Sequence, residues 1–317
     1  MPNLRRPRHG SMQFWPRKRA SSEVASVRFW ASSKDAKMLG FAGYKVGMTH
    51  VLFEDMRDRS MTKGKTISWP VTIIECPPIT VFSIKFYKNN NSCSQVFSEK
   101  FDKYLDRSMK LPKIKKTIND IRESDFDDLK LVVHTHPSLT TIGKKKPEIF
   151  EMALGGKKED KFRAAKELLG KEIKVKDLFK AGQLVDIHAI TTGKGLAGPV
   201  KRFGVSIRRH KSEKVKRGPG SLGGWRAQGH TMYRVAHAGK MGYNQRTEYN
   251  KQILKIDDKA ESINPKSGFK HYGVVRNQYI LVKGSILGPV KRLIRFTNPI
   301  RPDKNIKETD YNVRVVQ

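Results

Sequence analysis

The chain has 317 residues and carries 64 Lys and Arg against 30 Asp and Glu, a formal net charge of +34. This is about one uncompensated positive charge for every nine residues, and such self-repulsion opposes a compact state unless a polyanion neutralises it. The chain has 37% hydrophobic residues, which predicts a protein that has a core and binds nucleic acid, and excludes a fully disordered tail. It has no run of the roughly 18 to 20 apolar residues that spans a bilayer, and its N-terminus lacks the apolar core of a secretory signal, so neither feature is expected.

The first predicted element is a basic N-terminal extension over residues 1–37, which has nine Lys and Arg, two acids and little apolar periodicity. Residues 38–90 follow as apolar segments rich in Val, Ile and Phe and punctuated by Gly and Pro. This pattern is typical of short antiparallel strands that close into a β-barrel. Residues 38–90 are therefore predicted to be the first part of a barrel core.

An inserted α/β module is predicted over residues 91–184. It has 21 Lys and Arg but also 15 acids, half of all the acids in the chain, so its charge is nearly balanced. Apolar residues at helical spacing predict a helix over 157–169 that ends at Gly170. The apolar segments 129–137 and 146–154 are expected to pair as strands against this helix.

Residues 185–193 and 251–317 are predicted to complete the barrel, with the first and last apolar segments in one sheet. Between them, residues 194–250 form a second, internal basic extension in which Glu213 and Glu248 are the only acids. The chain is thus predicted to be mainly β, with an α/β insertion and two basic extensions. Two Gly-Pro-Val-Lys-Arg segments are expected to mark strand ends whose cations face outward, namely Lys201, Arg202, Lys291 and Arg292.

Two glycine-rich segments could suggest nucleotide binding, but neither carries a complete motif. Residues 193–198 match G-x-G-x-x-G, yet Pro199 follows directly, no amphipathic helix is expected to open there, and no acid lies about 20 residues on to hold a ribose. Residues 218–224 lack the Lys and Ser or Thr that end a phosphate loop. The first segment is interpreted as a hinge and the second as a tight turn before Trp225.

Other catalytic and metal chemistry finds equally little support. His134 and His136 would share one face of a strand, but no third ligand is near in the sequence, so they are interpreted as structural histidines. Cys76 and Cys93 do not form a C-x-x-C pair, which favours a reducing cytoplasm. Cys76 lies in the apolar run VTIIEC and is expected to be buried. No enzyme, cofactor, metal or small-molecule substrate is predicted.

The remaining chemistry is polyanion binding. An extension with this composition is expected to become ordered only when phosphate neutralises it. Irregular glycine-rich extensions suit the crevices of folded RNA better than the uniform groove of DNA. Trp225 could either stack on a base or pack on Met232 and Tyr233, and the surrounding charge favours RNA. The expected RNA contacts are Arg5, Arg6, Arg8, His9, Arg17, Lys18, Arg19, Lys194, Lys201, Arg202, Arg208, Arg209, Lys211, Lys214, Lys216, Arg217, Trp225, Arg226, His230, Lys240, Tyr243, Arg246, Lys291 and Arg292.

Several long segments resemble the ribosomal protein L3 family in its archaeal form. They are PRHGSMQFWPRKRA, GFAGYKVGMTH, LVVHTHP, LVDIHAITTGKGLAGPVKRFG, GSLGGW, VAHAGKMGYNQRTEYNKQI and YILVKGSILGPVKRLIRF. The resemblance implies a translation-protein-type β-barrel and two extensions into 23S-type ribosomal RNA. It implies a structural protein of the large subunit, a primary binder near the RNA 3′ end that nucleates 50S assembly.

The same resemblance implies that the internal extension reaches toward the peptidyl transferase centre with Trp225 at its tip, and that Gly239, Gly242, Tyr243, Arg246 and Thr247 lie in the returning strand of that loop. Neighbours of the L14 and L24e types are implied as protein partners. Two alternatives remain for the function, an accessory of an RNA-processing or RNA-modifying enzyme and a basic protein that compacts DNA.

Overall fold

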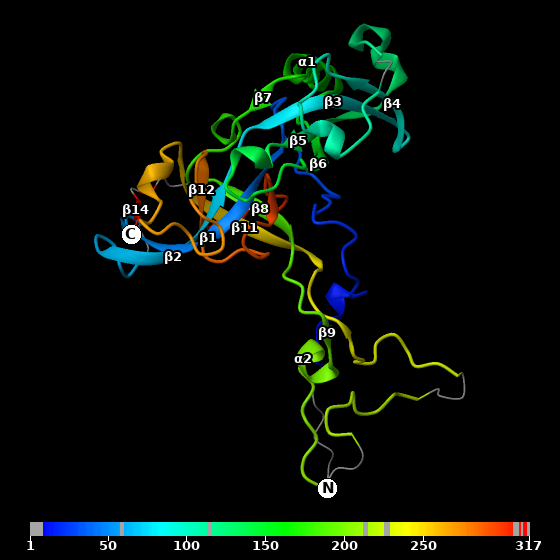
Figure 1. The fold of residues 1–317 in the computed structure, drawn as a ribbon, viewed down its shortest axis with the longest axis vertical. Helices are drawn as coiled ribbons and strands as arrows, with labels where there is room; N and C mark the ends of the chain where they lie inside the picture. Colours follow the sequence, from blue (N-terminus) through cyan, green and yellow to red (C-terminus); the bar gives the residue numbers. More distant parts are fainter. Residues whose placement is uncertain are drawn as a thin grey trace. The chain divides into compact units, whose positions relative to one another are not determined.

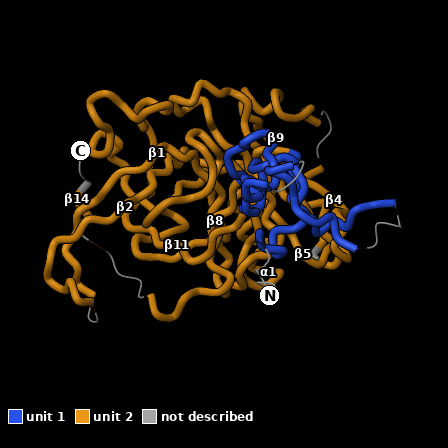
Figure 2. Tube along the Cα trace, turned by 90° about the horizontal axis from the view of Figure 1, so that it is seen from below, with its two compact units in different colours: residues 1–21, 190–245 blue, residues 22–189, 246–317 orange. Residues whose placement is uncertain are grey.

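The chain divides into two compact units, each built from segments that are distant in sequence (Figure 2). The smaller unit comprises residues 1–21 and 190–245, and the larger unit comprises residues 22–189 and 246–317. The fold is that of a computed structural model, which describes residues 9–57, 60–112, 116–211, 215–224, 229–306, 311 and 313–315. Among these residues, no helix is long and apolar enough to cross a bilayer.

The larger unit contains a seven-stranded sheet with the order β13-β8-β11-β12-β2-β1-β14. Figure 1 labels all of these strands except β13. Strand β13 also pairs with β1, so six of the strands close into a hydrogen-bonded ring with β14 outside it. The strands are β1 (Gly40–Glu54), β2 (Thr66–Glu75), β8 (Leu184–Ile190), β11 (Gln245–Asp257), β12 (Tyr279–Lys283), β13 (Leu293–Thr297) and β14 (Arg314–Val315).

The two halves of β1 differ in their pattern of burial. Its first seven residues are all buried, whereas its second half, from Met48, mostly alternates between exposed and buried positions. Continuous burial is typical of a strand covered on both faces, and alternation is typical of a strand with one face in solvent. The pairing of β1 with β13 confirms the prediction that the first and last apolar segments share a sheet.

A second sheet has the order β4-β3-β5-β6, with β7 paired to β3. Its elements are β3 (Ile79–Lys88), β4 (Asn91–Phe97), β5 (Asp128–Thr135), β6 (Ile149–Ala153) and β7 (Glu172–Ile173). Helix α1 (Lys158–Leu168) packs against this sheet through Phe162, which contacts Phe86 and Phe126. The predicted helix, the left-handed Gly170 after it and the predicted strand pair are therefore confirmed. Strand β3 lies in this second sheet, whereas the sequence grouped residues 79–88 with the barrel segments.

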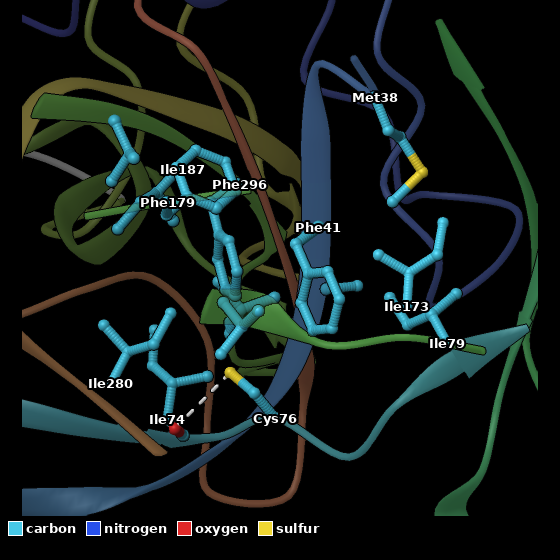
Figure 3. Close-up of a cluster of buried hydrophobic side chains, with 14 of the residues drawn as sticks. Met38, Phe41, Ile74, Cys76, Ile79, Ile173, Phe179, Ile187, Ile280 and Phe296 are labelled. Carbon is cyan, nitrogen blue, oxygen red and sulfur yellow. Dashed lines mark hydrogen bonds between the residues drawn. The ribbon is translucent and has the colours of Figure 1, made fainter. Parts of the chain in front are cut away.

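One continuous apolar core joins the two sheets of the larger unit. Figure 3 shows Phe41 of β1 between two groups of this core, with Phe179, Ile187 and Phe296 on one side and Met38, Ile79 and Ile173 on the other. Cys76 lies in the same cluster, and burial raises the pKa of its thiol well above the ordinary value. The prediction that Cys76 is a buried apolar residue is confirmed.

His188, on β8, is a buried polar residue with a partner at each ring nitrogen. Nδ1 lies 2.9 Å from Thr247 Oγ1, and Nε2 lies 3.2 Å from Thr297 Oγ1. Burial lowers the pKa of His188 to about 4, and the nearby Arg295 cation acts in the same direction. The folded larger unit therefore favours the neutral imidazole.

This burial predicts an acid-sensitive contribution to stability. Between the ordinary histidine pKa of about 6.5 and about 4, the unfolded chain binds a proton that the folded chain excludes, so the contribution is complete above pH 6.5 and is lost as the pH falls toward 4. His188→Gln should reduce the pH dependence of the free energy of unfolding, by an amount on the order of 1 to 3 kcal/mol over this range. Urea unfolding at pH 7 and pH 4.5 measures it. Replacing the exposed His50 by Gln is the control, and identical slopes for wild type and His188→Gln would contradict the prediction.

Candidate nucleic-acid interface

The smaller unit is organised around a two-chain stem, defined here as residues 191–197 and 239–244. Strands β9 (Leu196–Ala197) and β10 (Gly239–Lys240) pair antiparallel at one end. The Lys194 amide donates to the Met241 carbonyl, and the Met241 amide donates to the Gly195 carbonyl, both at 2.9 Å. These backbone hydrogen bonds hold the outgoing and returning chains of the internal extension together.

The N-terminal segment is attached to this stem. The Ala20 amide donates to the Tyr243 carbonyl at 2.7 Å, and the Asn244 side-chain amide donates to the Lys18 carbonyl at 2.6 Å. Asn244 is itself buried. The sequence predicts two separate basic extensions, whereas the structure places the described residues of 9–21 and of 194–245 in one unit.

An aromatic cluster supports the N-terminal segment. Trp15 lies against Phe203 and Tyr233, with ring centroids 5.6 and 5.9 Å apart. The Arg17 guanidinium lies over the Phe203 ring at 4.3 Å and donates to the Arg202 carbonyl at 2.8 Å. Arg17 thus combines a cation–π contact with a hydrogen bond, and this fixes its position.

Phe203 ends a short helix, α2 (Pro199–Phe203), that sequence analysis did not expect. Pro199 occupies its first position, where the missing amide hydrogen costs no hydrogen bond. Gly204 ends the helix with a left-handed φ of +71°. The expectation that no helix opens after Pro199 is therefore wrong, although five residues are far fewer than a dinucleotide-binding helix requires.

Two of the cations expected to face outward are engaged within the protein. The Arg202 guanidinium donates to the carbonyls of Lys240 and His237, at 3.1 Å in each case. In the larger unit, Arg292 is largely buried and lies 3.8 Å from the Glu23 carboxylate. The outward orientation predicted for Arg202 and Arg292 is therefore wrong, while their neighbours Lys201 and Lys291 are exposed.

Most of the other expected RNA contacts are accessible. The exposed ones are His9, Lys18, Arg19, Lys194, Lys201, Arg208, Arg209, Lys211, Lys216, Arg217, His230, Lys240 and Lys291. Tyr243 and Arg246 are half-buried, and burial lowers the pKa of Arg246. Lys291, Arg292 and Arg246 belong to the larger unit and the others to the smaller one. Arg5, Arg6, Arg8, Lys214, Trp225 and Arg226 lie outside the described residues.

The described residues of the smaller unit include no Asp or Glu. Its cations therefore have no carboxylate partner within that part of the unit. Clusters of like charge with no internal counter-charge favour binding to a polyanion, which releases condensed counterions as it is neutralised.

Exposed apolar side chains lie among these cations, and sequence analysis did not identify them as contacts. Leu196 is 73% exposed, Tyr233 70% and Phe14 50%. Aromatic and aliphatic side chains in a cationic setting can stack on bases or fill gaps in folded RNA. In the sequence, each of these three residues is apolar and lies in a basic segment without periodic apolar neighbours. This pattern could have identified them as candidate contacts.

A pocket of about 640 Å³ opens beside the stem, lined by Arg19, Lys240, Tyr243, the glycines 193, 195 and 242, and their neighbours. Its size is that of a small-molecule or nucleotide site. Cations together with glycine backbone suit close approach of a phosphate group. The described residues that line the pocket include no Asp, Glu, His or Cys, so no carboxylate there would repel a phosphate group.

Comparison with known proteins gives one consistent result. The family described as Ribosomal protein L3 matches residues 1–117 and 85–315, two overlapping stretches. The large ribosomal subunit protein uL3 of Methanocaldococcus jannaschii is 43% identical over 314 residues, which cover 95% of this chain and 93% of the relative. The uL3 proteins of Archaeoglobus fulgidus and Methanosphaera stadtmanae are 44% and 45% identical, covering 94% and 93% of this chain and 93% and 92% of the relatives.

A substitution at Gly242 tests the role of the stem, because a side chain at this position would disrupt the stem. Gly242 has a φ of +71°, and a Cβ atom there would lie 2.0 Å from the Thr192 carbonyl oxygen. Gly242→Ala should therefore speed hydrogen exchange at the Met241 and Tyr243 amides and weaken RNA binding. Gly204 is a matched control, because it has the same φ and its Cβ would meet nothing within 4 Å. If Gly242→Ala and Gly204→Ala gave the same exchange at these two amides, the stem would not depend on this close approach.

Proposed function

Because this chain belongs to the ribosomal protein L3 family, we propose that it is a structural constituent of the large ribosomal subunit and that it binds 23S-type ribosomal RNA there. One observation carries the binding proposal: the described part of the smaller unit has exposed cations and no Asp or Glu. Family membership confirms the resemblance seen in the sequence. It also assigns the chain a structural and not an enzymatic role.

RNA binding through this unit would combine three kinds of contact. Exposed Lys and Arg pair with phosphates and release counterions. The glycine-lined pocket beside the stem admits a phosphate or nucleotide close to the backbone. Phe14, Tyr233 and Leu196 offer surfaces on which unpaired bases stack or pack. None of these contacts reads a uniform duplex groove, so the combination favours a folded RNA over DNA.

The larger unit would act as the anchor for this interface. We assign its ring of six strands to the translation-protein-type β-barrel that the family resemblance implies. The nearly balanced charge of residues 91–184 suits contact with solvent or with protein neighbours such as those of the L14 and L24e types. The boundaries 1–37, 38–90, 91–184, 185–193 with 251–317, and 194–250 stay predictions.

The finer placement rests on the family resemblance. On that basis the protein binds in the cytoplasm as a primary binder near the 3′ end of 23S-type RNA and nucleates 50S assembly. The internal extension reaches toward the peptidyl transferase centre, with Trp225 at its tip. An accessory of an RNA-processing enzyme would use the same cations, and no feature of the described residues favours that alternative.

The salt dependence of RNA affinity tests which cations carry binding. Replacing Arg208, Arg209, Lys211, Lys216 and Arg217 together by Gln should weaken binding to a large-subunit RNA fragment and reduce the slope of log affinity against log salt by about 3.5 to 4.5, if each pairs with one phosphate. Filter binding between 50 and 300 mM salt measures it.

The matched control replaces five exposed lysines of the balanced module by Gln, namely Lys110, Lys145, Lys146, Lys171 and Lys180. This variant has the same net charge as the first and should retain most of the wild-type slope. Equal loss of slope in the two variants would show that total charge, and not the smaller unit, determines binding.

A further inference from the structure

Two histidines and an aspartate converge in the larger unit, at the end of β5. His134 and His136 are two residues apart and project from the same face, with ring centroids 4.8 Å apart. Asp102 comes from the chain between β4 and β5. Its Oδ2 atom lies 2.9 Å from His136 Nδ1 and 3.6 Å from His134 Nε2, and one ligand atom from each of the three residues lies within 4.8 Å of the others.

The sequence shows no third ligand near the two histidines, and their interpretation as structural residues rests on that. Asp102 precedes His134 by 32 residues, and only the folding of the β4–β5 connection brings it to them. Its other oxygen, Oδ1, accepts a hydrogen bond from the Tyr104 amide at 2.9 Å, which orients the carboxylate toward the imidazoles.

His134 is the residue that points to a missing ligand. Its side chain is only 1% exposed, yet neither ring nitrogen has a hydrogen-bond partner among the described residues. The 3.6 Å separation from Asp102 is too long for a hydrogen bond. A buried polar atom without a partner costs about 1–3 kcal/mol, so an unsatisfied imidazole facing a carboxylate calls for an explanation.

The arrangement around His136 supplies the support that a ligand needs. Its Nε2 lies 2.7 Å from the Thr80 hydroxyl on β3, which fixes the ring and leaves Nδ1 directed at Asp102. Metal-binding histidines usually have such a partner at the second nitrogen, because it sets the tautomer and the ring orientation.

We propose that Asp102, His134 and His136 form a binding site for a divalent transition-metal ion, with Zn²⁺ as the representative, and with Asp102 Oδ2, His134 Nε2 and His136 Nδ1 as ligand atoms. Tetrahedral Zn²⁺ with bonds of about 2.0–2.1 Å separates its ligand atoms by about 3.3 Å. The observed 2.9 and 3.6 Å lie on either side of that value. Two imidazoles favour Zn²⁺ over Mg²⁺ or Ca²⁺, which prefer oxygen ligands.

Binding involves no redox step. The metal takes the place of the proton at His136 Nδ1, and the neutral ring then carries its proton on Nε2, which donates to Thr80 Oγ1. Asp102 and His136 are partly exposed, so a water molecule can complete the coordination. The bound ion would fasten the β4–β5 connection, whose Leu105 packs on Phe82 and Val132, to the end of β5. This role is independent of RNA binding.

The test uses the full chain, purified free of RNA and treated with a chelator, and titrated with Zn²⁺ by calorimetry. We expect one Zn²⁺ per chain and a higher melting temperature on binding. Asp102→Asn keeps the size and hydrogen-bonding capacity of the side chain and should weaken Zn²⁺ affinity at least tenfold. Asp106→Asn, an exposed carboxylate in the same connection, should leave affinity unchanged.

Wild-type protein that binds no Zn²⁺, or Asp102→Asn that binds it as tightly as wild type, would overturn the proposal. A second measurement needs no variant. Co²⁺ added to the wild-type chain should give the visible absorption of a four-coordinate site without a thiolate band, since neither Cys76 nor Cys93 is a ligand. A thiolate band, or the weak spectrum of hydrated Co²⁺, would contradict the assignment.

Discussion

The separation of positive from negative charge along the chain is the constraint on which the rest of the structure depends. All acids among the described residues lie in the larger unit, and several are already used by local donors. Glu75 is buried and accepts hydrogen bonds from the Tyr272 hydroxyl and from the backbone amides of Arg276 and Asn277. Arg57, with help from nearby hydroxyls, holds the pKa of Asp55 far below its ordinary value. These carboxylates are engaged within the larger unit, whereas the described part of the smaller unit has exposed cations and no Asp or Glu.

Within the smaller unit, some cations build the scaffold and others remain available. Arg17 and Arg202 direct their guanidinium groups at backbone carbonyls, while Arg19, Lys201 and Lys240 stay exposed. The first group fixes the stem and the aromatic cluster. Because this part of the backbone is already fixed, less conformational entropy is lost when RNA binds. The available cations are thus presented by a partly organised surface.

Local patterns in the sequence predicted local structure well. The helical spacing of Phe162 and Ala165, with Gly170 after it, predicted α1 to within a residue at each end. Partners across the chain were harder, because hydrophobic periodicity gives burial but not neighbours. The assignment of residues 79–88 to the barrel segments shows this, since β3 has the composition of any buried strand and only its pairing with β5 places it.

The same contrast between local patterns and long-range contacts holds for the candidate interface. Composition identified the basic extensions, and family resemblance identified the protein class. Adjacent cations such as Lys201 and Arg202 look equivalent in the sequence, yet a fold that brings the His237 and Lys240 carbonyls within reach of the Arg202 guanidinium separates them. Asp102 beside His136 is a further case, because a carboxylate 34 positions away carries no local signal. These features depend on long-range contacts, which a single sequence does not encode in any short window.

The central claim is that the exposed cations of the smaller unit match a folded ribosomal RNA and not polyanions in general. Competition binding at 150 mM salt tests it directly, with a structured fragment of large-subunit RNA labelled and duplex DNA of equal phosphate content as competitor. We expect the RNA to bind at least tenfold more tightly than the DNA, since phosphate pairing is common to both but crevices and unpaired bases belong to the RNA alone. Equal affinities would contradict this account.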